Sequence, residues 1–270
     1  MNITELAHFG LDTNPFDKAV PGDHLWLPPS KQGVVDALVD TVTERRWSLL
    51  VGDPGVGKTC VLRALRDRLS TVHFRLHYIA HVTLGRRDFY RQLCYALGIA
   101  PKSTPAAMFE GIRKECHTSA SEHRAHTVLV LDEAQLMPDS TMSQLHVLAN
   151  FDWDSEPMLS LVYVGLPELH DKLRLGIHRS LLSRIHTRIE LSAGSPELTA
   201  AYVRSRLAEA GAKTELFTAD GLAVLHEETG GLLRSVNVVA TAALRLAVAE
   251  GTTFIDRDLV RRAVHHTPLA

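Results

Sequence analysis

The sequence predicts an α/β domain with a parallel five-stranded sheet covered by helices on both faces, followed by a small all-helical part. Up to residue 191, short apolar runs alternate with amphipathic stretches, which is the pattern of parallel strands linked by helices. After Ser192 the remaining segments all have helical periodicity, and Gly211, Gly230-Gly231 and Gly251 end them.

The elements of the α/β part follow one another in a regular order. A turn at Pro21-Gly22 precedes an amphipathic helix expected near Ser30–Glu44. The expected strands are 47–51, 72–80, 127–131, 159–164 and 187–191. Helices are expected near 58–69, 86–97, 105–116, 140–150 and 167–185, and then at 196–210, 218–228, 232–249 and 256–266. This order predicts an N-terminal segment over 1–46, an α/β core over 47–194 and a helical lid over 195–270.

The composition excludes several classes of protein. With 45% hydrophobic and 22% charged residues in a chain of 270, the sequence is neither disordered nor collagen-like. Three cysteines with no CxxC spacing exclude a disulfide framework and fit a reducing cytosol. No apolar stretch reaches the roughly 18 residues that span a bilayer, and no secretion signal is visible, so a cytoplasmic protein without a membrane span is expected.

A glycine-rich motif follows the first predicted strand. Gly52-Asp53-Pro54-Gly55-Val56-Gly57-Lys58-Thr59, continued by Cys60, matches the pattern G-x-x-x-x-G-K-[ST] between a strand and a helix. Its glycines allow the backbone to wrap a phosphate, and the amides and the positive helix end face the anion. Lys58 is expected to reach the terminal phosphates, and the Thr59 hydroxyl to bind Mg²⁺. The motif predicts a nucleoside-triphosphate site.

Two carboxylates end the third predicted strand. Val128-Leu129-Val130-Leu131 is a buried strand, and Asp132 and Glu133 follow at the sheet edge where open α/β sheets bind ligands. Asp132 is expected to hold Mg²⁺ through water, and Glu133 to activate the attacking water. An ordinary surface carboxylate is the alternative for Glu133. Because no N-K-x-D string for guanine occurs, ATP is favoured over GTP.

Together these motifs resemble those of AAA+ ATPases, with Walker A at 52–59, Walker B at 128–133 and the lid after residue 195. More narrowly, the chain resembles the ExeA-like and TniB-like ATPases, which include transposition regulators related to MuB and TnsC. The segments that carry the narrower resemblance are His8-Phe9-Gly10-Leu11, Asn14-Pro15-Phe16, Asp132-Glu133-Ala134-Gln135, Val164-Gly165-Leu166-Pro167-Glu168-Leu169 and Gly230-Gly231-Leu232-Leu233-Arg234.

The resemblance implies roles for further residues. Arg234 matches the sensor 2 arginine that contacts the γ-phosphate, with a solvent-facing helix arginine as the alternative. Arg184 resembles the arginine finger that reaches a neighbouring subunit's ATP, with Arg179 and Arg188 or a plain surface arginine as alternatives. Pro15 and Phe16 resemble the segment along the nucleotide base, with a hydrophobic staple as the alternative.

One position departs from the family pattern. The strand that ends at Val164 is normally followed by a polar sensor 1 residue, but Gly165-Leu166-Pro167 offers none. The polar group is therefore absent, displaced or replaced by water, and ATP hydrolysis could be slow. Slow hydrolysis would suit a protein that times the lifetime of an assembly better than one that drives movement.

A DNA-binding role depends on local basic residues. The net charge is −2, which points to no nucleic acid by itself. Arg86 and Arg87 open the helix on which related transposition ATPases place pore-facing residues, and they could contact phosphates without reading sequence. A solvated helix start is the alternative. Because a single subunit would bind DNA weakly, affinity is expected only after ATP-driven assembly aligns copies of this pair.

The favoured functional prediction is an ATP- and Mg²⁺-dependent homo-oligomer, a ring or a filament, that binds double-stranded DNA and recruits or regulates a transposase. Two alternatives stay open. One is an ExeA-like secretion ATPase, whose relatives carry a membrane segment and a wall-binding part that this sequence lacks. The other is a nucleotide-gated scaffold that contacts only proteins.

Overall fold

The computed structural model describes residues 1–17, 25–148, 150 and 156–267, and it divides into two compact units. The sheet unit comprises residues 29–52 and 61–191, and the helical unit comprises residues 1–28, 53–60 and 192–270. The expected N-terminal segment over 1–46 is thus shared between the two units. The turn expected at Pro21-Gly22 lies outside the described residues.

The sheet unit contains the predicted five-stranded parallel sheet. Its strands are β1 (Trp47–Gly52), β2 (Phe74–Ile79), β3 (His126–Leu131), β4 (Leu159–Gly165) and β5 (Ile185–Leu191). They pair in the order β2-β3-β4-β1-β5, and every pairing is parallel. All residues of β1, β3 and β4 are buried, as expected for the central strands of a sheet covered on both faces.

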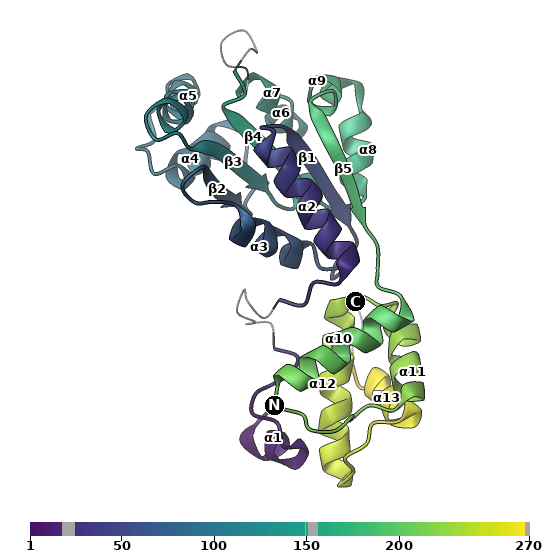
Figure 1. Cartoon of the computed structure of the whole chain (residues 1–270). Helices are drawn as coiled ribbons and strands as arrows, with labels where there is room; N and C mark the ends of the chain where they lie inside the picture. The colour runs from purple at the N-terminus through teal and green to yellow at the C-terminus, as the bar shows by residue number, and fades with distance from the viewer. Residues whose placement is uncertain (18–24, 149, 151–155, 268–270) are drawn as a thin grey trace. The chain divides into compact units, whose positions relative to one another are not determined.

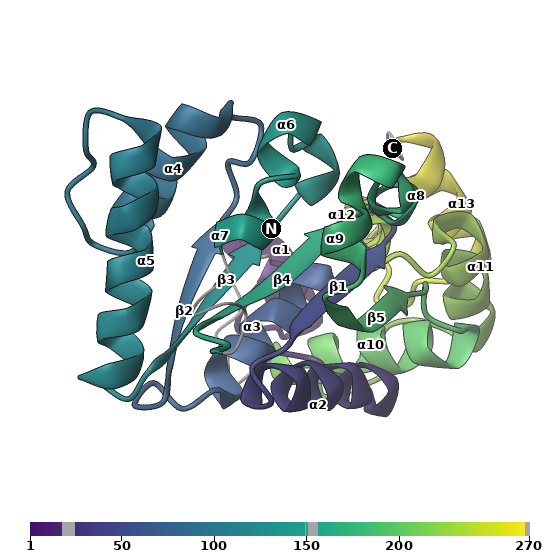
Figure 2. The same ribbon diagram turned by 90° about the horizontal axis from the view of Figure 1, so that it is seen from above.

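Helices cover both faces of this sheet (Figure 2). On one face lie α2 (Pro29–Thr43) and α3 (Lys58–Arg68). The other face carries α4 (Arg86–Ala96), α5 (Pro105–Ser121), α6 (Asp139–Met142), α7 (Leu145–Leu148), α8 (Glu168–Arg174) and α9 (Arg179–Leu182). Two short 3₁₀ turns lie among these elements: η2 (Ala134–Leu136) joins β3 to α6, and η4 (Gly176–His178) joins α8 to α9.

Two expected helices are interrupted. The helix expected over 140–150 is two short helices, α6 and α7, and residue 149 lies outside the described part of the chain. The helix expected over 167–185 is divided into α8, η4 and α9, because the backbone leaves the helical region at Leu175 (φ −59°, ψ 142°) just before Gly176. Strand β5 accordingly begins at Ile185, two residues before the expected start.

The helical unit confirms the predicted helical C-terminal part (Figure 1). It contains α1 (Ile3–Phe9), α10 (Pro196–Glu209), α11 (Ala219–Thr229), α12 (Leu233–Glu250) and α13 (Arg257–His265). The side chains of Ser195, Thr218 and Asp256 cap α10, α11 and α13 by accepting a backbone N–H three residues on. Among the helices described, none is long and apolar enough to cross a membrane.

Candidate nucleotide-binding site

The phosphate-binding loop, residues 53–60, lies in the helical unit. Gly55 (φ 83°) and Gly57 (φ 108°) adopt positive φ angles that glycine accepts without a steric penalty. A β-carbon at Gly55 would lie 2.8 Å from the β-carbon of Arg234, so a side chain at this position would collide with α12. The loop backbone is therefore in direct contact with the first turn of α12, which carries the expected sensor 2 arginine.

Lys58 and Thr59 begin α3 at the end of this loop. The first turn of a helix attracts anions through its amides and its dipole. The residue Lys58 is 9% exposed, and its ammonium donates to the carbonyl oxygen of Asp53 at 3.1 Å, which holds the side chain across the loop. The Thr59 side chain is exposed, as a ligand of a metal–phosphate complex would have to be. The loop can thus hold a triphosphate chain with Mg²⁺ at Thr59.

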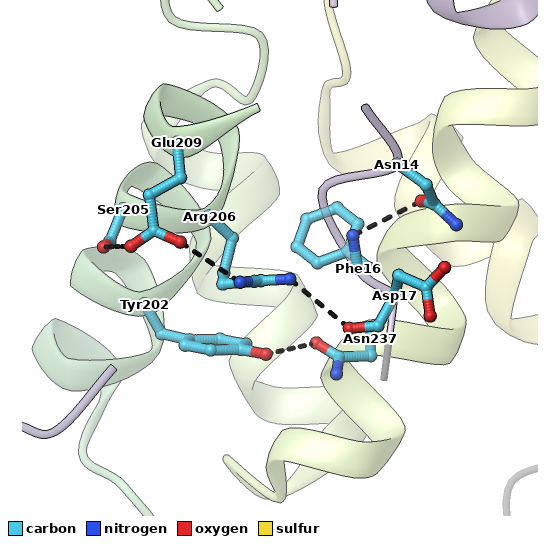
Figure 3. Close-up of polar contacts among 8 residues, drawn as sticks. All are labelled: Asn14, Phe16, Asp17, Tyr202, Ser205, Arg206, Glu209 and Asn237. Atoms are coloured by element: carbon cyan, nitrogen blue, oxygen red, sulfur yellow. Dashed lines mark hydrogen bonds and ion pairs between the residues drawn. The ribbon is translucent and has the colours of Figure 1, made fainter. Parts of the chain in front are cut away.

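The N-terminal segment is fixed to the lid helices (Figure 3). Phe16 is 5% exposed in the apolar core of the helical unit, and its N–H donates to Asn14 Oδ1 at 3.3 Å. Arg206 of α10 is buried and donates to the carbonyl oxygen of Asp17 at 3.3 Å and to Glu209 at 3.1 Å. Pro15 is buried as well. The segment expected along the nucleotide base therefore packs against α10 and α12.

Two polar side chains of the lid lie next to this segment. Tyr202 of α10 donates to Asn237 Oδ1 of α12 at 2.7 Å, and Asn237 lies one turn beyond Arg234. Burial raises the pKa of Tyr202, against the opposing effects of the hydrogen bond to Asn237 and the positive charge of Arg206. The helical unit thus brings Tyr202 and Asn237 of the lid helices close to Phe16 and Asp17.

The Walker B carboxylates lie in the sheet unit, directly after β3. Asp132 is 8% exposed; its Oδ1 accepts the N–H of Glu133 at 2.9 Å, and its Oδ2 accepts the hydroxyl of Tyr78 from β2. Partial burial and the hydrogen bond to Asp132 raise the pKa of the Tyr78 phenol. The phenol therefore stays protonated and serves as the donor of this hydrogen bond.

Glu133 adopts a left-handed backbone conformation (φ 51°, ψ 35°), which is uncommon for a residue other than glycine and is often found at functional sites. Its side chain is exposed, and Oε2 accepts a hydrogen bond from Gln135 Nε2 at 2.7 Å. Sequence reasoning gave Gln135 no role of its own. The glutamine is visible in the string Asp-Glu-Ala-Gln, but its contact with Glu133 arises only because the chain turns sharply after β3.

The two Walker motifs leave the sheet at the same edge. Gly52 is the last residue of β1 and begins Walker A, whereas Asp132 directly follows the last residue of β3. Because β1 and β3 both run parallel to β4, which lies between them, their carboxyl ends share one edge of the sheet.

Arg184 lies at the opposite edge. It precedes Ile185, which pairs with Trp47 at the amino end of β1, and its guanidinium carbon is 5.9 Å from the centroid of the Trp47 ring. Of the alternatives, Arg188 donates to the carbonyl oxygen of Leu182 at 3.0 Å, and Arg179 begins α9. Arg184 is therefore placed away from Asp132 of its own chain.

The two candidate DNA-contacting residues lie at the start of α4. Both Arg86 and Arg87 are exposed, and Arg87 donates to the carbonyl oxygen of Ser103 at 3.4 Å. This position leaves the Arg86 and Arg87 side chains accessible to a large anionic partner.

Comparisons with known proteins identify the domain. Residues 42–173 match the family model described as "AAA domain". The chain is 34% identical over 206 residues to the general secretion pathway protein A of Aeromonas hydrophila, an alignment that covers 76% of this chain and 37% of that protein. The chain therefore spans little more than a third of the length of this curated relative.

Solved structures share the fold at lower identity. Cdc6p from Pyrobaculum aerophilum matches 92% of this chain and 69% of its own, with a TM-score of 0.70 and 18% identity. A chain of Drosophila ORC bound to DNA matches 98% of this chain and 67% of its own (TM-score 0.72, 16% identity). The RuvB branch migration motor of Thermotoga maritima matches 94% of this chain and 73% of its own (TM-score 0.61, 14% identity). The chain therefore has the AAA-type P-loop fold, and the ExeA-like part of the resemblance is supported.

Proposed function

We propose that this AAA-domain chain binds ATP with Mg²⁺ through its Walker motifs and hydrolyses it to ADP and phosphate. The observation that carries the proposal is the contact of Gly55 in the phosphate-binding loop with Arg234 of the lid. The approach of the loop to the backbone and β-carbon of Arg234 supports a role in which its guanidinium contacts the triphosphate and couples the lid to the state of the γ-phosphate.

Each residue of the site has a defined task in this proposal. Thr59 and Asp132 would each offer an oxygen ligand to Mg²⁺, which would neutralise charge on the phosphates. Lys58 moves from the Asp53 carbonyl to the terminal phosphates. Glu133 accepts a proton from the attacking water as the water oxygen forms its bond to the γ-phosphorus, and the bond to the β,γ-bridging oxygen breaks. Pro15 and Phe16 border the base.

The test compares ATP turnover and ATP binding in three proteins. Lys58→Ala should lose ATP binding, because the loop loses its cation. Glu133→Gln should bind ATP as the parent does but hydrolyse it roughly 100-fold to 10,000-fold more slowly, because the glutamine cannot accept the proton. Turnover in Glu133→Gln equal to that of the parent would overturn the assignment of the base.

We further propose that the ATPase serves a secretion-associated process rather than transposition. The secretion pathway relative at 34% identity supports this role. The expectation that a missing membrane segment and wall-binding part weigh against secretion does not hold, because the chain aligns with only 37% of that relative.

An ATP-dependent site of this kind works where ATP is supplied, so we place this domain on the cytoplasmic side. Loss of the gene should reduce protein export, and the Glu133→Gln form should fail to restore it.

DNA binding remains a second candidate because Arg86 and Arg87 are exposed at the start of α4. Structures of related fold include one bound to DNA. In a gel shift with random duplex DNA at low salt, ATP-dependent binding would support this candidate and the transposase-regulating role attached to it. The double variant Arg86→Ala/Arg87→Ala should then release about two fewer counterions on binding, so the slope of log K against log salt concentration becomes shallower. The matched control is Arg45→Ala/Arg46→Ala, another exposed adjacent pair. No ATP-dependent shift would exclude this candidate.

A further inference from the structure

Gln135 connects two parts of the sheet unit that are far apart in the sequence. Its Nε2 donates to Glu133 Oε2 at 2.7 Å, and its Oε1 accepts the N–H of Leu166 at 3.2 Å. Leu166 directly follows β4, where the resemblance to AAA+ ATPases implies a polar sensor 1 group. One side chain therefore spans from the expected catalytic base to the end of the neighbouring strand.

Gly165 makes room for this side chain. A β-carbon at Gly165 would lie 2.4 Å from Gln135 Oε1 and 2.9 Å from Leu169 Cδ2, so any side chain there would displace the Gln135 amide. The absence of a sensor 1 side chain at Gly165 is therefore what allows Gln135 to take its position. A residue with a side chain at the end of β4 and the bridge from Gln135 exclude each other.

The backbone that carries Gln135 is also fixed. Lys172 of α8 donates to the carbonyl oxygen of Gln135 at 3.0 Å and to that of Met137. The same ammonium lies 3.4 Å from Asp139 Oδ1. The turn η2 is therefore held in place from α8, and the Gln135 amide reaches Glu133 from a backbone that is itself anchored.

We propose that Gln135 is a positioning residue that orients the Glu133 carboxylate toward the attacking water and takes over the task of the missing sensor 1 group. Its two hydrogen bonds fix the base relative to the end of β4, as outer partners fix the ligands and bases of other active sites. The inference rests on the proposed function, because it takes Glu133 as the base of ATP hydrolysis.

The test is a double-mutant cycle on Gln135 and Gly165. Gln135→Ala should slow single-turnover ATP hydrolysis on the order of 10-fold to 100-fold while the Kd for ATP changes less than about twofold. Gly165→Ala should have the same effect, because its β-carbon displaces the amide without altering Gln135. The double variant should be no slower than either single variant, since both remove the same hydrogen bonds. Multiplicative losses would overturn the proposal.

Two controls separate this role from general disturbance. Gly33→Ala adds a β-carbon to the same unit at a position with nothing within 4 Å, and Gln92→Ala removes an amide from α4. Both should hydrolyse ATP at the parent rate. If Gln135→Ala fails to fold by circular dichroism, Gln135→Glu replaces it, because it keeps an acceptor for the Leu166 N–H but cannot donate to Glu133. Its hydrolysis should slow by a similar factor.

The comparison with Glu133→Gln distinguishes the two proposals. If Glu133→Gln abolishes turnover while Gln135→Ala and Gln135→Glu keep the parent rate, the positioning role is overturned and the proposed function stands. If the parent and Glu133→Gln turn over ATP equally, the proposed function fails, and the positioning role fails with it.

Discussion

Burial decides the protonation state of individual residues in the sheet unit, and His126 is the clearest example. It is the first residue of β3 and 4% exposed, and its Nε2 lies 2.8 Å from Ser160 Oγ. Burial, assisted by the positive charge of Arg45, lowers the pKa of the imidazole to about 4, whereas the unfolded chain titrates near 6.5. The folded protein therefore holds a neutral imidazole in its core at neutral pH.

This residue predicts a pH dependence of stability. As the pH falls below about 6.5, His126 takes up a proton in the unfolded chain but stays neutral in the folded protein. The contribution of His126 to the free energy of unfolding is therefore fully present above pH 6.5 and is lost toward pH 4. Between pH 7 and pH 5, His126 should lower the free energy of unfolding by on the order of 2 kcal/mol. Urea unfolding at both pH values should show a smaller fall for His126→Gln than for the parent. Equal falls would contradict the prediction.

At the scale of elements, the N-terminal segment behaves as part of the lid. Phe9, Leu11 and Phe16 belong to the same apolar core as α10 to α13, and Arg206 binds the carbonyl of Asp17. The chain thus begins in the helical unit, enters the sheet unit at α2, passes through the helical unit with the phosphate-binding loop at 53–60, and returns to it at Ser192. The segment proposed to border the base is consequently held by the lid that carries Arg234.

Removing the anchor of this segment should weaken the helical unit. Phe16→Ala leaves a cavity in the core, so the free energy of unfolding should fall by about 3 kcal/mol, and ATP should bind more weakly if the segment borders the base. The matched control is Phe254→Ala in the same unit, where the ring is 61% exposed and the loss should stay within about 0.5 kcal/mol. Thermal unfolding and ATP titration measure both effects. Similar losses in the two variants would contradict the anchoring role.

At the scale of the whole molecule, the positions of Arg184 and Asp132 favour a site completed by a second copy. Arg184 lies at the amino edge of the sheet, beside Trp47, and Asp132 at the carboxyl edge. A residue at the amino edge can act as an arginine finger only on the nucleotide of a neighbouring subunit. We therefore propose that the active form is a homo-oligomer.

Mixing two inactive variants tests this arrangement. Glu133→Gln keeps its finger, and Arg184→Ala keeps its base, so a mixed assembly contains some interfaces with both groups intact. In a random equimolar mixture, about a quarter of the interfaces meet this condition, and about a quarter of the parent ATPase rate should return. Arg184→Ala alone should be inactive. A mixture as inactive as its components would place the finger at Arg179 or Arg188, or show that Arg184 acts elsewhere.

Local sequence patterns were sufficient to predict the parallel sheet, the helical lid and the two Walker motifs. These features follow from local patterns: apolar runs at strand length, glycines where the backbone wraps a phosphate, and carboxylates directly after a buried strand. The sequence also indicated the break at Gly165, where no polar side chain follows β4. Each of these signals lies within a few consecutive residues, and no distant partner is needed to interpret them.

Which distant residues lie together could be seen only in the folded protein. The contact of Gly55 with Arg234, the placement of Phe16 against α10 and α12, and the bridge from Gln135 to Glu133 and Leu166 all join segments separated along the chain. Such contacts depend on how helices and strands pack, so the sequence alone indicates only that Gly165 lacks a polar side chain. In the folded protein, the Gln135 amide lies where a side chain at position 165 would be.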